Sequence, residues 1–479
     1  MSFCGEVSPA SRRCGGAILS AVLFALASPS FAQSIATLKG RITDPSGAIV
    51  QGATITLRER DTGVERNATS DAAGDYQFIF LPIGTYRLEV QSTGLRPELI
   101  PRLVIEVGRT IVQDFRLEVG DVAETLDVVA DVPLIERSIA LGQIIDQRTL
   151  QDIPLNGRQL LQLALLVPGS MTPPQNGFLT TPSRAQGSQG LNTAGNREDT
   201  ANFQVNGVTL NDLINNILVF QPPLDAVQEF RIDNGSVSAE EGRNGGASLN
   251  IVTRSGTNQF HSGLSAYFRD QALDARNLFS TSEAPFERQQ IGGYAAGPLA
   301  RNRAFFFVTY EGLRQQQGLP VNTVVLNDAQ RAAITDPVIR NVSALIPRPT
   351  VVDERGVARY IGAADAPVET DRVAADLAHT FSATDRLHAF YALQRDWRLE
   401  PLELGNTIPG FGDVRSGRRQ LLTLEYTRTA GPRWVNQARA GFSRIAFDAQ
   451  PNAAVAPSDY GLDTGGHAGR SRWQRPTST

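Results

Sequence analysis

The stretch from Val227 to Arg269 constrains the fold of this chain more than any other segment. Two strand-like runs, VQEFRIDN and ASLNIVTR, are joined by a glycine-rich segment and lead into FHSGLSAYFR, a strand of alternating polarity. Upstream lie short strands and a few helices, whereas downstream strand pairs alternate with long polar loops. The pattern predicts that a compact unit leads directly into a barrel wall.

Length and charge limit the classes of protein to consider. A chain of 479 residues has room for about two to four domains. Its hydrophobic content of 41% and charged content of 20% are ordinary for folded protein. A net charge of -4 and the lack of a basic stripe argue against a nucleic-acid partner.

The first 32 residues read as an export signal. Arg12 and Arg13 supply the positive region, and an apolar run from Ala17 to Ala27 follows. Small residues then predict signal cleavage between Ala32 and Gln33. The apolar run is too short for a spanning helix, and no later run reaches the necessary length of about 20 residues. Any membrane association is therefore expected through β-structure or partners.

Both cysteines, Cys4 and Cys14, fall within the predicted signal. The mature chain would therefore contain no disulfide framework and no thiolate metal site.

From Ile35 to about Val119, short β runs alternate with turns such as DPSG at Asp44–Gly47. About 85 residues with a turn every 8 to 12 predict one small β-sandwich. Gly40–Leu57 and Ser70–Val90 resemble the carboxypeptidase regulatory-like domains, which implies a transthyretin-like or carbohydrate-binding-like fold and a non-catalytic role. A sugar site would need exposed aromatic side chains, but alternation favours core packing for the candidates, which are Tyr76, Phe78, Phe80, Tyr86 and Phe115.

The segment ETLDVVA, Glu124–Ala130, is rich in β-branched residues and lies between two domains. An extended segment of this kind can add to the edge of a partner's sheet. It resembles the TonB box of outer-membrane receptors, although Asp127 stands where an apolar residue is usual, and the alternative is a plain linker strand. The resemblance implies a periplasmic TonB-type energy-transducing partner, and the matching positions are Glu124, Thr125, Leu126, Val128 and Ala130.

The segment DIPLNGRQLLQLALLVPG predicts a short buried helix. Asn156 can cap a helix that begins near Gly157, and Pro168 with Gly169 would end it. The next 40 or so residues are rich in Gly, Asn, Gln, Thr and Pro, a composition that suits a hydrated lumen better than a hydrophobic core.

Motifs from Ile153 to Arg314 occur in the order found in one family. IPLNGRQLLQLALLVPG, NREDTANFQVNGVTLND and the opening stretch resemble the plug of a TonB-dependent receptor of the Oar-like group. FHSGLSAYFRDQALDARNLF, RQQIGGYAAGPL and NRAFFFVTYEGLR resemble the first barrel strands of that group. The resemblance implies that a plug is followed by an outer-membrane barrel.

The later hairpins alternate in polarity. In LLTLEYT, Leu422, Leu424 and Tyr426 face one side, while the intervening polar residues face the other. A transmembrane strand needs this pattern over about 9 to 11 residues. The alternative is a soluble antiparallel sheet with one wet face, which shows the same alternation.

Size predicts an incomplete barrel. About 220 residues follow the plug, enough for roughly eight to ten strands, whereas plugged transporters use about 22. We therefore expect a C-terminally truncated copy. The expected domains are a signal at 1–32, the sandwich at 33–119, the TonB box and plug at 120–256, a partial barrel at 257–447, and a disordered or frameshifted tail at 448–479.

No constellation of catalytic residues is present. None of the four histidines is spaced as a metal pair with nearby carboxylates, and strand or loop surface positions are expected for them: His261, His379, His388 and His467. Carboxypeptidase activity is disfavoured because zinc ligands are missing. Glu240 and Glu241 beside Arg243 favour a solvated or plug-to-wall ionic role over acid–base catalysis. The sequence therefore predicts no enzyme, no metal and no cofactor.

Together these features predict a mainly β protein: an N-terminal sandwich, an α+β plug and the first strands of an antiparallel outer-membrane barrel. The function implied is energy-coupled uptake by a TonB-dependent receptor with its N-terminal domain in the periplasm. Its expected partners are the TonB-type protein, outer-membrane lipid and an unidentified extracellular substrate, with carbohydrate left open. The alternative is a secreted or surface carbohydrate-binding or adhesion β protein without transport.

Overall fold

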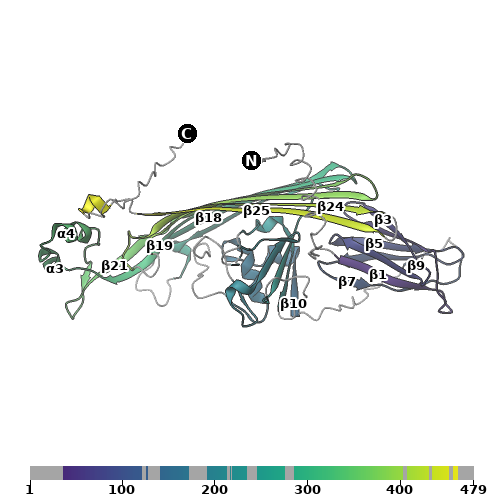
Figure 1. Cartoon of the computed structure of the whole chain (residues 1–479), viewed down its shortest axis with the longest axis horizontal. Coiled ribbons are helices and arrows are strands. Elements are labelled where there is room, and N and C mark those ends of the chain that lie inside the picture. The colour runs from purple at the N-terminus through teal and green to yellow at the C-terminus, as the bar shows by residue number, and fades with distance from the viewer. Residues whose placement is uncertain are drawn as a thin grey trace, which may run out of the picture.

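The computed structural model is elongated, with a long curved sheet above, a smaller β domain beneath its middle and a β-sandwich at one end (Figure 1). The structure describes residues 36–120, 126–127, 141–171, 191–212, 216, 218, 220–234, 245–275, 285–402, 407–430, 434–452 and 457–461. The predicted signal with its Ala32–Gln33 cleavage site lies outside the described residues, as do Glu240, Glu241 and Arg243. The predicted TonB box is described only at Leu126 and Asp127.

Two sheets form the sandwich. One contains β1 (Ala36–Thr43), β4 (Asp75–Leu81), β7 (Thr110–Val112) and β8 (Phe115–Arg116), with β1 pairing to the other three. The other has the order β3 (Glu65–Thr69), β2 (Thr54–Glu59), β5 (Gly84–Gln91), β6 (Glu98–Ile105) and β9 (Leu126–Asp127). The predicted sandwich is confirmed, and β9 extends its second sheet.

Most aromatic residues of the sandwich lie in its core, as alternation predicts. Tyr76, Phe78, Tyr86 and Phe115 are all buried. Phe80 is the exception, and the expectation that it shares the core face was wrong. Its backbone turns to φ 57°, and the pairing of β1 with β4 shifts register there. The bulge places Leu81 in the core instead, where its side chain is fully buried.

The domain beneath the long sheet, here called the plug, surrounds a five-stranded mixed sheet. Its strand order is β10 (Leu141–Asp146), β15 (Val227–Asn234), β16 (Ser248–Thr253), β13 (Asn202–Val205) and β14 (Val208–Thr209). The remaining elements are α2 (Gln147–Asp152), the short 3₁₀ turns η1 (Asn156–Arg158), η2 (Leu160–Leu166), η3 (Glu198–Thr200) and η4 (Leu224–Ala226), and the pair β11 (Ser170–Met171) and β12 (Asn192–Thr193).

The single helix predicted near Gly157 was wrong. Gly157 has a positive φ of 68° and interrupts the segment, so the helical residues form two 3₁₀ pieces. Gln159 precedes the second piece without a side-chain cap. Leu160, Leu161 and Leu163 are buried as expected, whereas the following two leucines are partly exposed.

A nine-stranded antiparallel sheet, here called the wall, covers the plug. Its main path is β17 (His261–Asp270), β18 (Phe286–Ala300), β19 (Ala304–Val324), β22 (Val368–Thr380), β23 (Asp385–Glu400), β24 (Asp413–Thr429) and β25 (Val435–Pro451). Two further strands, β20 (Val351–Val352) and β21 (Ala358–Asp365), extend the long β19. Among the described residues, β17 and β25 each pair on one side only, so they are the edges of the sheet.

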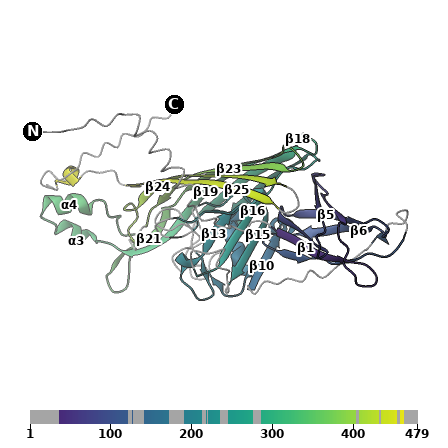
Figure 2. The same ribbon diagram turned by 45° about the vertical axis from the view of Figure 1, so that its right-hand side comes forward.

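The connections at the two ends of the wall differ in length. At one end are short turns, for example residues 301–303 between β18 and β19 and 381–384 between β22 and β23. At the other end are longer segments carrying η5 (Gln271–Leu273), α3 (Asp328–Ala332), α4 (Pro337–Ser343) and, after β25, η6 (Pro457–Tyr460). The sandwich lies at the short-turn end, and α3 and α4 lie at the opposite end (Figure 2).

The two faces of the wall have different chemistry. The face toward the plug carries buried polar residues such as Thr309, Glu311, Thr370 and Arg372. The outward face carries exposed apolar side chains in neighbouring rows, among them Ile291, Val308, Tyr310, Val373, Leu377, Tyr391, Leu424 and Phe442. A soluble sheet with one wet face would expose its polar side, so the burial pattern favours a lipid-facing exterior.

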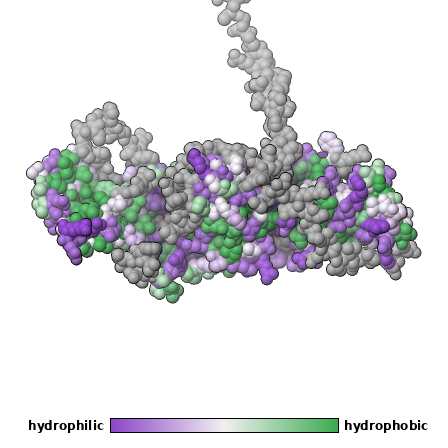
Figure 3. Space-filling model, turned by 90° about the horizontal axis from the view of Figure 1, so that it is seen from below, coloured by the Kyte–Doolittle hydropathy of each residue, from purple (hydrophilic) through white to green (hydrophobic). Residues whose placement is uncertain are grey.

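The opposite side of the molecule is mixed. Seen from below, where the plug and the sandwich are exposed, hydrophilic and hydrophobic side chains are interspersed (Figure 3). Among the helices that the structure describes, none is long and apolar enough to cross a membrane.

Candidate functional site

Three consecutive plug residues, Asn156, Gly157 and Arg158, attach the plug to the wall. The Asn156 side-chain oxygen accepts a 2.5 Å hydrogen bond from Nη1 of Arg288, and the Gly157 carbonyl accepts one of 3.4 Å from Gln290. Gly157 and Arg158 both have positive φ, at 68° and 51°. This left-handed turn, which is costly for a residue with a side chain, directs three successive residues to the same surface.

Arg158 lies at the centre of a buried ionic network. Its Nε donates to Glu311 on β19 at 2.9 Å, and its Nη2 lies 2.9 Å from Asp225 within the plug. Arg372 on β22 donates to the other oxygen of Glu311, also at 2.9 Å. The side chains of Glu311 and Arg372 are each only 3% exposed, so these charges depend on one another for compensation.

Arg158 also contacts the first wall strand. Its Nη1 donates to the Tyr267 hydroxyl at 3.0 Å, and its guanidinium lies 5.2 Å from the centre of that ring. One plug side chain therefore reaches both β17 and β19. The sequence motif contained this arginine, but separation from its acidic partner by 153 residues hid the contact.

A second arginine packs at the junction between plug and wall. The guanidinium of Arg254 lies 4.5 Å from the centre of the Tyr294 ring and 5.1 Å from that of Phe307. These two rings stack on each other across β18 and β19. Cation–π contacts of this kind are strengthened where water is excluded.

The sandwich is hydrogen-bonded to the plug through the turn that follows β6. The Val107 amide donates to Glu229 Oε1 at 2.8 Å, and the Val107 carbonyl accepts from Arg231 at 2.7 Å. Both partners are on β15. Burial raises the pKa of Glu229 to about 7, with nearby Glu106 adding to the effect. A carboxyl group is therefore placed in a poorly solvated contact between two domains.

The sandwich also contacts the wall. The Asn258 amide donates to the Asp61 carbonyl at 3.0 Å, and its side chain donates to the Thr62 carbonyl at 2.8 Å. Asn258 is joined in turn to Asn302, in the turn between β18 and β19. The β2–β3 turn of the sandwich thus lies against the β18–β19 turn of the wall.

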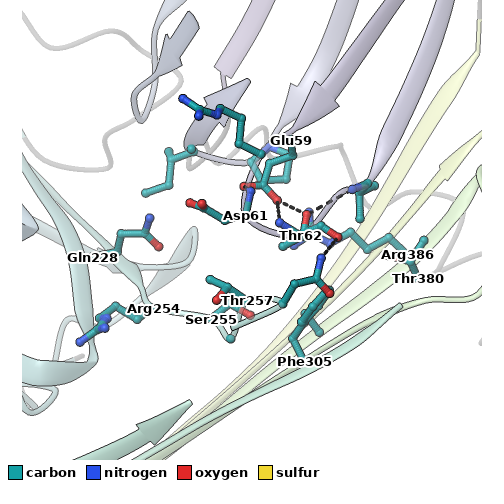
Figure 4. Close-up of a pocket in the computed structure, with 18 of the residues that line it drawn as sticks. Glu59, Asp61, Thr62, Gln228, Arg254, Ser255, Thr257, Phe305, Thr380 and Arg386 are labelled. Carbon is teal, nitrogen blue, oxygen red and sulfur yellow. Dashed lines mark hydrogen bonds between the residues drawn. The ribbon is translucent and has the colours of Figure 1, made fainter. Parts of the chain in front are cut away.

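A cavity of about 660 Å³ lies where the sandwich, plug and wall meet. In Figure 4, Glu59, Asp61 and Thr62 of the sandwich face Arg254, Ser255 and Thr257, with Thr380 and Arg386 of the wall at one side. Burial raises the pKa of Glu59, which accepts hydrogen bonds from the backbone of its own turn. The displaced Phe80 also lines this cavity.

The described part of the predicted TonB box is a strand. Leu126 and Asp127 form β9, which pairs in parallel with Glu98 and Leu99 of β6. The predicted extended conformation is therefore seen at these two positions, and the strand adds to the edge of the sandwich.

The histidines differ in how well they fit the expected surface positions. His261 is exposed, and His379 packs edge-on against Phe381. His388 was expected at the surface, but its side chain is only 17% exposed, and its Nε2 lies 2.6 Å from Oδ2 of the fully buried Asp376. His467 lies outside the described residues. Within the described ranges, no three His, Cys, Asp or Glu side chains are grouped as a metal site would require.

Comparison with known families agrees with this architecture. Residues 37–118 match the carboxypeptidase regulatory-like domain, and residues 252–335 and 332–475 match the outer membrane beta barrel domain. The chain therefore contains a carboxypeptidase regulatory-like domain followed by an outer membrane beta barrel domain, which confirms the resemblance seen in its motifs and the expected outer-membrane localisation.

The chain is similar to the TonB-dependent transporter Oar of Myxococcus xanthus. The two are 25% identical over 358 residues, which is 70% of this chain and 32% of the relative. This chain therefore spans about a third of the length of that relative, as the 32% coverage shows.

Among solved structures, the transporter YddB from Escherichia coli is similar at a TM-score of 0.44 and 11% identity, over 64% of this chain and 39% of that one. The ferric enterobactin receptor mutant from Pseudomonas aeruginosa is similar at a TM-score of 0.40 and 14% identity, over 64% and 41%.

Proposed function

We propose that this chain acts in energy-coupled uptake as a TonB-dependent receptor of the outer membrane. The observation that carries the proposal is the attachment of the plug to the polar face of the wall through Asn156, Gly157 and Arg158. Hydrogen bonds and ion pairs can break and re-form when the plug is displaced, and they lie beside an apolar contact in which Phe307 and Phe390 of the wall share a buried cluster with the plug. Glu311 and Arg372 would keep each other compensated when Arg158 leaves.

The proposed orientation has the sandwich in the periplasm. Outer-membrane barrels have short periplasmic turns and longer external loops. The sandwich contacts the short-turn end of the wall, through Asn258 and Asn302. The proposed domains are the sandwich at 33–119, the coupling segment and plug at 120–256, and barrel strands at 257–447.

In this proposal Glu124–Ala130 is the coupling segment, and its partner-binding positions are Glu124, Thr125, Leu126, Val128 and Ala130. A periplasmic TonB-type protein would pair with this extended segment by strand addition, and force on it would shift the plug. The substrate would bind from outside.

Fractionation tests the proposal against the alternative of a secreted or surface carbohydrate-binding or adhesion protein. We expect the protein expressed from its own gene to be recovered with outer-membrane vesicles and to resist carbonate extraction. Recovery in the soluble secreted fraction would reject the receptor proposal.

A second test concerns the coupling segment. Leu126→Pro removes a backbone N–H, and we expect it to abolish binding to the purified periplasmic domain of a TonB-type protein. Ser138→Pro is the matched control, because it places the same residue in the same linker outside the proposed segment. Equal binding by both variants and the unaltered chain would reject the assignment.

A further inference from the structure

We propose that strand β6 transmits force from the coupling strand to the plug, so that the sandwich is a mechanical part of the coupling path. The inference rests on the proposed function, because it takes β9 as part of the coupling segment. Its basis is that strand β6, Glu98–Ile105, pairs with the coupling strand β9 near its first end and leads at its other end into a contact with the plug.

At its first end, β6 holds the chain that leads to the plug. The Arg96 amide donates to the Glu118 carbonyl at 2.7 Å, and Leu95 forms an isolated bridge with Val119. The parallel pairs Glu98–Leu126 and Leu99–Asp127 follow. The linker is therefore attached along this edge of the sandwich before it continues to the plug.

A proline in β6 limits how a neighbouring strand can pair with it. Pro101 lies in β6 and has no N–H to donate to a neighbouring strand. Proline in a strand is tolerated at a sheet edge, and there it limits how far an added strand can pair. The described pairs, Glu98–Leu126 and Leu99–Asp127, lie just before this proline.

At its other end, β6 leads directly into the plug contact. Two residues after Ile105, both backbone groups of Val107 bond to buried charged side chains, Glu229 and Arg231. Gly108 has a φ of 66°, and a Cβ atom there would lie 2.6 Å from Nη1 of Arg231. The turn is thus fitted closely against β15.

The strand between these ends moves with the sandwich as one body. Ile100, Leu103 and Ile105 are at most 5% exposed and belong to the hydrophobic core of the sandwich. A displacement of the β9 edge therefore reaches Val107 through packed structure instead of a flexible segment.

The alternative path runs along the chain itself. Residues 128–140 separate β9 from β10, and such a segment can extend to about 45 Å before it becomes taut. The path through β6 is already in contact with the plug. Force applied at β9 would therefore reach β15 through the sandwich first.

Single-molecule pulling distinguishes the two paths. One handle is attached at Asp127→Cys and the other at Ala383→Cys in the β22–β23 turn, in the full chain reconstituted in lipid. Cys4 and Cys14 are replaced by serine, so no other thiol competes. In the unaltered background we expect the first plug unfolding event at short extension.

Gly108→Val introduces a side chain against Arg231 and should release the sandwich from the plug. The plug event should then move outward by up to about 45 Å, because the linker must become taut first. Gly52→Val is the matched control: Gly52 has a φ of 77° and no neighbour within 4 Å of an added Cβ, so its backbone strain is similar without the contact. This control should leave the extension unchanged.

Hydrogen exchange at the Val107 amide verifies release, and a Glu229→Ala, Arg231→Ala double variant releases the same contact by removing both partners. An unchanged extension in a released variant would overturn the proposal. Photo-crosslinking from position 127 to the periplasmic domain of a TonB-type protein tests the coupling segment separately. Failure of that crosslink in the unaltered chain counts against the proposed function. The extension at which the plug unfolds tests only whether force passes through β6.

Discussion

Arg158 in the plug and Glu311 on wall strand β19 form a buried ion pair with 2.9 Å between Nε and Oε2. The side chains are 11% and 3% exposed. Because Asp225 also depends on Arg158, removal of this one guanidinium leaves two carboxylates with less compensation.

Arg158→Ala should therefore loosen the plug. We expect a loss of about 3 kcal/mol in the free energy of plug opening, measured by hydrogen exchange of plug strands in the intact protein. Arg197→Ala is the control, since its ion pair with Asp199 involves an arginine side chain that is 84% exposed. That change should cost less than about 1 kcal/mol. Equal effects of the two variants would contradict the role assigned to Arg158.

Gly157→Ala tests the left-handed turn of the same motif. A Cβ atom at this position would lie 3.2 Å from Nη1 of Arg288, in addition to the strain of a φ of 68°. Gly195→Ala carries similar strain at a φ of 75° but meets nothing within 4 Å. Both should cost about 1 kcal/mol from the backbone, and any excess at Gly157 in denaturant unfolding measures the wall contact. If the loss of unfolding free energy at Gly157 is no larger than that at Gly195, the contact with Arg288 tolerates a methyl group.

Docking of the sandwich should depend on pH through Glu229. Its pKa is raised to about 7 by burial, and the charged groups facing it are Glu106, Arg231 and Arg109. Undocking returns the carboxyl to water and an ordinary pKa near 4.5. The docked state therefore binds the proton more tightly, so its advantage is complete below about pH 4.5 and is lost as pH rises through about 7.

The change in docking free energy between these limits is about 3 kcal/mol. Exchange of the Val107 amide, measured between pH 5 and 8 and corrected for intrinsic rates, should show docking weakening as pH rises. Glu229→Gln keeps an acceptor for the amide and should flatten the profile. A profile of the same slope in that variant would assign the titration to another group.

Val308→Arg tests the apolar exterior. Val308 is 43% exposed on the outward face, with apolar neighbours in the adjacent strands. A charge on the lipid face should cost about 2 to 4 kcal/mol near the bilayer midplane, measured by folding into lipid vesicles. Gln316→Arg places the same residue on the same face of β19 beyond the apolar rows, and it should cost less than about 1 kcal/mol. If both changes are tolerated equally, this face does not contact lipid.

Local periodicity correctly predicted which side chains are buried where a strand is regular. Alternation in LLTLEYT placed Leu424 outward and Thr423 inward, as the structure has them. The turns and alternation of the sandwich likewise predicted the burial of Tyr76 and Phe78. These patterns hold because a strand pairs regularly on both sides and keeps its period of two residues.

Predictions from the sequence were wrong where contacts between distant segments decide the position of a side chain. A bulge rotates Phe80 out of the core, and the wall side chain of Arg288 takes the Asn156 oxygen that was expected to cap a helix. His388 looked like a surface residue, but its partner Asp376 is on the neighbouring strand. The contacts of Arg158 and Val107 join segments more than 100 residues apart, which no single-sequence pattern contains.

The contact of the sandwich with Asn258 and Asn302 also bears on biogenesis. Asn302 is in the turn between β18 and β19, so its position is fixed only after these two strands have paired. The sandwich is synthesised before the wall, but the surface to which it docks forms later, when the wall assembles. Docking of the sandwich therefore requires that β18 and β19 have paired, and protection of the Thr62 turn from proteases would report that step during membrane insertion.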